Sequence, residues 1–184
     1  MLSKQENMKI KTETILTVSK YLALLGGVGS SIIFGSQFLT LVSSFINPEW
    51  AKHTYQVDLT LFSIREQSIG FYVMAMILTI AVSVLKALFW YRVFGLLSEL
   101  KLQNPFSREV VVKLEMMAYI LFCVWILSSI FWKTYTFYLT QATGIQLPIR
   151  NSDDEYLFMA GIIYIISQIF KRGIELQEEN QLTV

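Results

Sequence analysis

Residues 92–113 have the sequence RVFGLLSELKLQNPFSREVVVK, a cationic segment that lies between two pairs of long apolar blocks. Short loops rich in Lys and Arg stay on the cytoplasmic side of a membrane, so this segment predicts the orientation of the spans on either side of it. Within it, Asn104 is a favourable N-cap and Pro105 suits the first position of a helix. We therefore expect a helix to begin at Pro105.

The composition of the 184-residue chain is typical of a membrane protein. Hydrophobic residues make up 54% of the chain and charged residues 16%, whereas charged residues make up about 25% of an average soluble domain. The apolar blocks have the lengths that transmembrane helices need. The formal net charge of +1 supplies no overall basic field, so we expect contact with the lipid bilayer and no direct binding of nucleic acid.

These blocks predict an all-α integral membrane protein with four transmembrane helices in a single membrane domain, residues 1–184. The last apolar run, Tyr156–Phe170, is about 22 Å long at 1.5 Å per residue, which is short for a bilayer. It can span if Lys171 and Arg172 extend to the interface, and a re-entrant segment is the alternative. The expected spans are 21–46, 69–91, 114–138 and 155–172, with a cytoplasmic segment at 92–113 and a cytoplasmic tail at 173–184.

The placement of the cations predicts that both termini lie in the cytoplasm. With this orientation most of the 15 Lys and Arg residues are on the inner side of the membrane, as expected for loops that are not translocated. The cations left on the outer side are Lys52, Arg65, Lys133 and Arg150.

The two outer loops carry alternating apolar residues, a pattern of period two that indicates strands. The first alternation runs from Tyr55 to Leu61, after Asn47 and Pro48 have ended the first span. The second alternation consists of Ile145, Leu147 and Ile149. We expect the loops to form a small β cap, and loops that simply lie over the spans are the alternative.

Small residues repeat every four positions in the first span, at Ala23, Gly27, Ser31 and Gly35. Membrane helices associate where small residues let their backbones approach closely. We therefore expect this stripe to be a helix-packing face, and a glycine-lined substrate path is the alternative. The second span repeats the spacing at Thr79 and Ser83, which makes it the expected partner.

The sequence contains no P-loop, Rossmann glycine fingerprint, His-Glu-x-x-His or Gly-x-Ser-x-Gly motif. His53 is the only histidine, and Glu49 and Asp58 are the only nearby residues that could share a metal ion with it. The single cysteine, Cys123, cannot form an internal disulfide. We therefore expect no catalytic site, no metal, no cofactor and no enzymatic activity.

Two charged stretches are candidates for docking a partner. Phe106, Arg108 and Glu109 lie at the amphipathic start of the third helix, and acidic residues follow the basic pair Lys171-Arg172 near the C-terminus. Such acids can bind a basic protein surface; a solvated helix end anchored at anionic lipid is the alternative. For the start of the third helix, the alternatives are a face that lies on lipid or one that packs under the bundle. The candidate docking residues are Asn104, Pro105, Phe106, Arg108, Glu109, Glu175, Glu178 and Glu179.

The segment NPFSRE at 104–109 and the tail KRGIELQEENQLTV at 171–184 together resemble a family of small four-span bacterial membrane proteins catalogued as a domain of unknown function. The resemblance covers about residues 15–184. It implies a multi-pass protein of the bacterial cell membrane that is encoded beside a short Cro-like helix-turn-helix regulator. The family tail often has Asp where this chain has Gln181.

These observations lead to the hypothesis of a non-enzymatic membrane protein that modulates or sequesters a small helix-turn-helix transcription regulator through its cytoplasmic face. A small transporter or a bacteriocin-immunity-type membrane protein is the alternative, because the first span is rich in Gly and Ser and the outer loops are substantial. Assembly into a homo-oligomer is compatible with both hypotheses.

Overall fold

The computed structural model describes residues 2–54, 59–100, 107–147 and 154–182. Over these ranges every regular element is a helix and no strand occurs, which confirms the all-α prediction. The elements are α1 (Leu2–Ile46), α2 (Pro48–Thr54), α3 (Leu59–Gln67), α4 (Ile69–Glu99), α5 (Arg108–Trp125), the π-helical segment η1 (Ile126–Phe131), α6 (Trp132–Thr143) and α7 (Asp154–Leu182).

Four of the helical stretches are long and apolar enough to cross a bilayer, so the protein is a multi-pass membrane protein with four candidate spans. The third stretch is continuous through α5, η1 and α6. The predicted spans 21–46, 69–91, 114–138 and 155–172 lie within these four stretches. Their bounds are Thr12–Ile46, Ile69–Glu99, Arg108–Thr143 and Asp154–Glu179.

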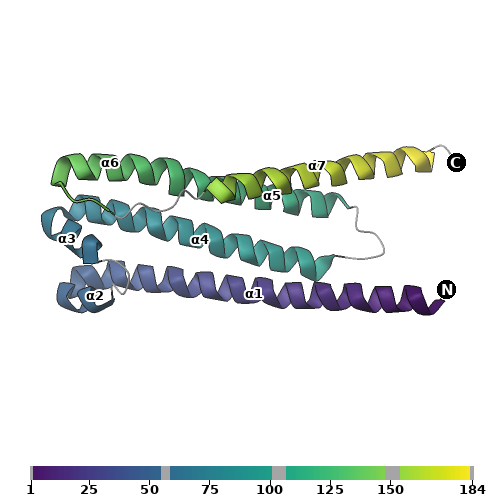
Figure 1. Ribbon diagram of the computed structural model, residues 1–184, viewed down its shortest axis with the longest axis horizontal. Helices are drawn as coiled ribbons and strands as arrows, with labels where there is room; N and C mark the ends of the chain where they lie inside the picture. The colour runs from purple at the N-terminus through teal and green to yellow at the C-terminus, as the bar shows by residue number, and fades with distance from the viewer. Residues whose placement is uncertain (1, 55–58, 101–106, 148–153, 183–184) are drawn as a thin grey trace.

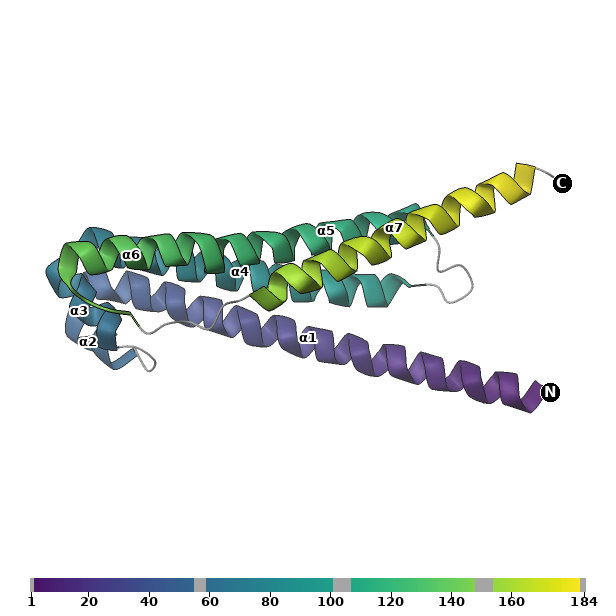
Figure 2. The same ribbon diagram turned by 45° about the horizontal axis from the view of Figure 1, so that its top comes forward.

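The long helices lie side by side as antiparallel rods (Figure 1). Both chain termini lie at one end of the molecule, which we call the termini end, and α2 and α3 lie at the other, which we call the α2–α3 end. Packing follows the order of the chain, from α1 to α4, from α4 to α5 and from α5 to α7. Helices α1 and α7 form the two edges of this series and diverge toward the termini end (Figure 2).

Local sequence accounts for the points at which the helices begin and end. Helix α1 ends at Ile46, before Pro48, which cannot continue a helix. Asn47 then caps α2, because its side-chain oxygen accepts a hydrogen bond of 3.1 Å from the backbone N–H of Trp50. Helix α6 ends at Thr143 and is capped by Gly144, whose φ of 73° lies in the left-handed region that glycine adopts readily.

The start of α5 differs from the prediction. The N-cap is Ser107, whose hydroxyl oxygen accepts a hydrogen bond of 3.3 Å from the backbone N–H of Val110. Helix α5 therefore begins at Arg108 rather than at Pro105. The predicted cap, Asn104, lies outside the described residues, as do Pro105 and Phe106.

The predicted β cap is wrong where the structure describes it. Leu59 and Leu61 belong to α3, which buries Phe62 and Ile64 against the rest of the molecule. A helix satisfies its own backbone hydrogen bonds, whereas a strand needs a neighbour to pair with. Ile145 and Leu147 follow α6 without forming a strand, while 55–58 and 148–153 lie outside the described residues.

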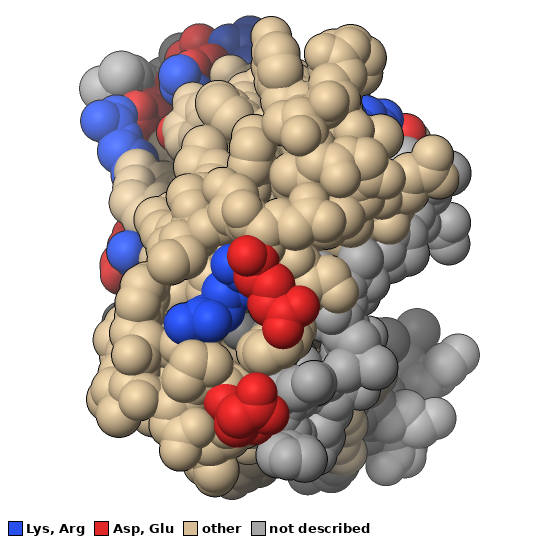
Figure 3. All heavy atoms as spheres, turned by 90° about the vertical axis from the view of Figure 1, so that its left-hand side faces the viewer, with Lys and Arg blue, Asp and Glu red and all other residues tan. Residues whose placement is uncertain are grey.

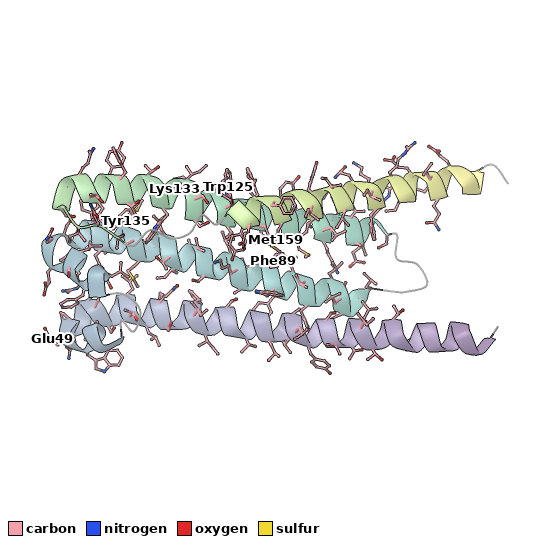
Figure 4. All side chains as sticks on the ribbon, viewed as in Figure 1. Glu49, Phe89, Trp125, Lys133, Tyr135 and Met159 are labelled. Carbon is pink, nitrogen blue, oxygen red and sulfur yellow. The ribbon has the colours of Figure 1, made fainter. Side chains whose placement is uncertain are left out.

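Helix α7 packs along only about half of its neighbour, the continuous α5–η1–α6 helix. Asp154, its first residue, accepts a hydrogen bond of 3.2 Å from the indole N–H of Trp125, midway along the continuous α5–η1–α6 helix (Figure 4). Lys86 of α4 lies near the same level, with its Nζ 4.8 Å from the centroid of the Tyr156 ring. These contacts fix where α7 begins.

Two apolar clusters lie in the two halves of the molecule, one toward the α2–α3 end and the other toward the termini end. One joins α3, α4 and α6 with Leu147, and includes Tyr135, whose hydroxyl donates a hydrogen bond of 2.9 Å to the backbone oxygen of Phe71. Tyr135 lies between α6 and α4 (Figure 4). The other cluster joins α4, α5 and α7 through Phe89, Leu96, Met117, Leu121 and Ala160.

The α1–α4 interface contains most of the predicted small residues. Ala23 and Gly27 are buried, and an added Cβ at Gly27 would lie 3.2 Å from Cε1 of Tyr91. The hydroxyl oxygens of Ser31 and Tyr91 are 3.2 Å apart. The rings of α4 therefore occupy the space beside these small residues.

Other residues of the two stripes have different surroundings. Ser83 donates a hydrogen bond of 2.8 Å to Oε1 of Gln37 in α1, whereas the Thr79 hydroxyl bonds within its own helix to the backbone oxygen of Ala75. Gly35 has nothing within 4 Å of an added Cβ. The tightest contact belongs to Gly26, which the four-residue spacing does not include: an added Cβ there would lie 2.6 Å from Cδ2 of Trp90.

We expect Gly26→Ala to lower the free energy of unfolding by about 1–3 kcal/mol, because the new methyl group would overpack the Trp90 ring. Gly35→Ala, in the same helix, has open space and should raise stability by about 0.4–1 kcal/mol, because alanine restricts the unfolded chain. Chemical unfolding in detergent micelles, followed by circular dichroism, measures both. Equal effects of the two substitutions would contradict this description of the interface.

Candidate functional site

A groove of about 330 Å³ lies between the start of α5 and the second half of α7, toward the termini end. We call it the α5–α7 groove. Three of the predicted docking residues, Arg108, Glu175 and Glu178, line it together. The complete lining consists of Arg108, Val111, Val112, Glu115, Lys171, Ile174, Glu175 and Glu178.

Exposed ion pairs form the rim of the α5–α7 groove. Nη2 of Arg108 lies 3.1 Å from Oε1 of Glu178 and so joins α5 to α7, with the two side chains 79% and 53% exposed. On α7 itself, Nη1 of Arg172 lies 2.9 Å from Oε2 of Glu175, one helical turn away. Because exposed pairs of this kind stabilise a protein by only about 0–1 kcal/mol, they can exchange partners at low cost.

The floor of the groove is apolar with one polar contact. Val111 is buried, Val112 is exposed and Ile174 lies across from them on α7. The side-chain amide of Gln168 donates a hydrogen bond of 3.1 Å to Oε1 of Glu115, joining the two helices below the rim. The floor therefore offers apolar contact area inside a charged border.

The other predicted docking residues are placed differently. Glu109 accepts a hydrogen bond of 3.0 Å from Nζ of Lys113, which also bonds the carboxylate of Glu99 at the end of α4. Glu109 therefore takes part in the contact between α4 and α5 and does not line the groove. Glu179 lies on the exposed surface of α7, one position beyond Glu178.

Glu115, Gln168 and the pair of Lys113 with Glu99 were not among the predicted site residues. The sequence gives only a weak indication of these residues, which is that each is a polar residue near the end of an apolar run. Glu115 and Gln168 lie 53 positions apart. Only the register between two packed helices brings them together.

The rest of the described structure offers little for metal or thiol chemistry. Within the described ranges, no three His, Cys, Asp or Glu side chains come close enough to hold a metal ion. Cys123 is a free, exposed thiol in α5. The side chain of His53 lies outside the described part of the chain.

Figure 3 looks onto the α2–α3 end, where charged side chains form small separate groups on a mostly uncharged surface. The α5–α7 groove lies toward the termini end and combines two ion pairs, an exposed Lys171 and an apolar floor. Chemically, this arrangement can exchange ion pairs with a charged protein segment and bury some of its apolar surface.

Comparison with known protein families gives a match over most of the chain. Residues 11–184 match a family model described as "Protein of unknown function (DUF2975)". No curated protein and no solved structure matches the chain.

We expect the pair of Arg108 and Glu178 to contribute about 0.2–1 kcal/mol to stability at low salt, because both side chains are exposed. A double-mutant cycle with Arg108→Gln, Glu178→Gln and the combined variant measures this coupling, with chemical unfolding as the readout. The coupling should disappear in high salt, which screens exposed charges. A coupling that persists in high salt would contradict the exposed geometry.

Proposed function

The chain belongs to the DUF2975 family of proteins of unknown function, and from this premise we propose that it is a non-enzymatic membrane protein that binds a small helix-turn-helix transcription regulator in its α5–α7 groove. The single observation that carries the proposal is the rim of the groove, where exposed ion pairs hold Glu175 and Glu178. Binding at the membrane would sequester the regulator from DNA.

Charge complementarity supports this kind of partner. The DNA-facing surface of a helix-turn-helix domain is basic, because it contacts phosphates through Lys and Arg. Arginines of such a surface could replace Arg108 beside Glu178 and Arg172 beside Glu175, and each exchange would cost little. The same contacts would cover the groups that bind DNA, so docking on the membrane and binding to DNA would exclude each other.

The apolar floor supplies the second part of the proposed interface. Interfaces gain affinity mainly from a desolvated centre, while rim charges set specificity and the rate of association. Val112 and Ile174 are apolar residues that line the α5–α7 groove together with its charged side chains. An apolar side chain of the regulator would pack there.

The proposal requires the termini end to face the cytoplasm, and the distribution of cations supports that orientation. Lys20, Arg92, Arg108, Lys113, Lys171 and Arg172 lie in the termini half of the described chain, whereas Arg65 and Lys133 lie toward the α2–α3 end. Cations flanking spans are retained on the cytoplasmic side. We therefore propose that both termini are inside, in a bacterial plasma membrane.

Labelling of single cysteines tests this orientation. In a Cys123→Ser background, Gln141→Cys near the end of α6 should react with an impermeant maleimide added to intact cells, because its side chain is exposed at the α2–α3 end. Gln177→Cys, exposed on α7, should react only after the cells are opened. Labelling of Gln177→Cys in intact cells would exclude the proposed orientation and with it the docking proposal.

Co-purification with a small helix-turn-helix regulator, which the family resemblance leads us to expect beside the gene, tests the partner. Glu178→Lys should weaken the complex roughly tenfold or more, because it places a cation opposite the basic surface. Glu66→Lys makes the same charge change on the exposed surface of α3, at the other end of the molecule, and should leave binding unchanged. The affinity of the wild-type complex should fall with added salt.

Truncation before Gly173 provides the second arm of this experiment. It removes Ile174, Glu175 and Glu178 from the α5–α7 groove and should abolish binding. If either the truncated protein or Glu178→Lys binds the regulator as tightly as the wild type does, the groove is not the docking site.

A further inference from the structure

A second groove, of about 580 Å³, lies at the α2–α3 end between the first turns of α4 and the continuous η1–α6 helix. We call it the α4–α6 groove. Its walls are formed by Gly70, Phe71 and Met74 on one side and by Phe131, Tyr135 and Tyr138 on the other. The volume lies within the range of about 300–1,000 Å³ that is usual for small-molecule sites, and apolar and aromatic walls with a few polar groups are usual there too.

The groove results from a glycine in one wall and large aromatic side chains in the other. Gly70 leaves the α4 wall open, since an added Cβ would meet only the Ser68 hydroxyl oxygen, at 3.9 Å. Phe131, Tyr135 and Tyr138 recur at helical spacing and therefore share one face of their helix. The result is an open groove between the two helices rather than a closed cavity.

The two ends of the α4–α6 groove differ in polarity. At one end is Ser68, the N-cap of α4, whose hydroxyl makes no capping hydrogen bond. The first backbone N–H groups of a helix have no partners within that helix, and they carry the positive end of its dipole. Met74 and Phe131 form the other end, about 9 Å farther along α4 at 1.5 Å per residue.

The groove opens sideways onto the surface of two candidate spans. Met74, Phe131 and Tyr138 are 47%, 49% and 59% exposed. Along α4 the exposed apolar surface continues from Met74 to Ile77, away from Ser68. In a bilayer, this surface is in contact with acyl chains, and the groove is continuous with it.

From the shape, the polarity and the sideways opening, we propose that the α4–α6 groove binds one acyl chain of a membrane phospholipid, with the lipid headgroup at the Ser68 end. The chain lies against Phe71, Met74 and Phe131 and fills the space that Gly70 leaves open. This site is independent of the docking proposed for the α5–α7 groove.

Native mass spectrometry of the purified, detergent-washed protein tests the site. The wild type should retain one lipid, and Gly70→Phe should reduce the retained fraction roughly tenfold, which corresponds to about 1.4 kcal/mol. The matched control is Gly95→Phe, in the same helix near the termini end, where an added Cβ meets nothing within 4 Å. Met74→Trp fills the groove from a second position and should also reduce retention.

Circular dichroism and size-exclusion elution check that the variants fold like the wild type. If the wild type retains no lipid after washing, or if both groove-filling variants retain as much as Gly95→Phe, the site does not exist as proposed. Because Met74→Trp changes a different side chain, the comparison holds even if Gly70→Phe fails to fold.

Reconstitution of the delipidated protein identifies the bound lipid. Vesicles of phosphatidylglycerol, vesicles of phosphatidylcholine and free palmitate are offered in separate experiments. Retention of either phospholipid supports the proposal. Retention of palmitate and of neither phospholipid would overturn it, because the ligand would then be a free fatty acid.

Discussion

The hydrocarbon core of a bilayer contains no water to satisfy a peptide group, and this constraint determines most of the architecture. Each spanning segment has to satisfy its backbone hydrogen bonds internally, and a helix does so within one segment. Helices in lipid then gain little from hiding one apolar side chain against another. Close fit, as between Gly26 and the Trp90 ring, and hydrogen bonds such as that from Ser83 to Gln37 are what remain to hold them together.

Hydrophobic length and local stop signals made the span-forming helices predictable from sequence. Pro48 marks the end of α1 because a helix cannot continue through proline. The β cap failed because alternation over a few residues does not say whether a pairing strand is present, and the described part of that stretch buries Phe62 and Ile64 as a helix. The cap of α5 is Ser107 rather than Asn104, since serine and asparagine are both favourable caps and the sequence offers both within four residues.

The candidate site was predictable in part for a similar reason. The charge pattern identified Arg108, Glu175 and Glu178, since basic and acidic residues at the ends of apolar runs are visible in one sequence. It could not place Glu109 with Lys113 or join Glu115 to Gln168, because those contacts depend on the register between helices. The sequence also did not predict that α7 begins midway along the continuous α5–η1–α6 helix, since the contact between Trp125 and Asp154 joins two different spans.

The late start of α7 has a consequence for how the molecule opens. Helix α7 packs chiefly on α5, through the cluster that contains Ala160, and it does not contribute to the cluster around Tyr135 and Leu139. Proteins open in contiguous cooperative units whose stabilities differ. Helix α7 therefore belongs to a different unit from the cluster around Tyr135, so that an opening which exposes α7 can leave that cluster packed.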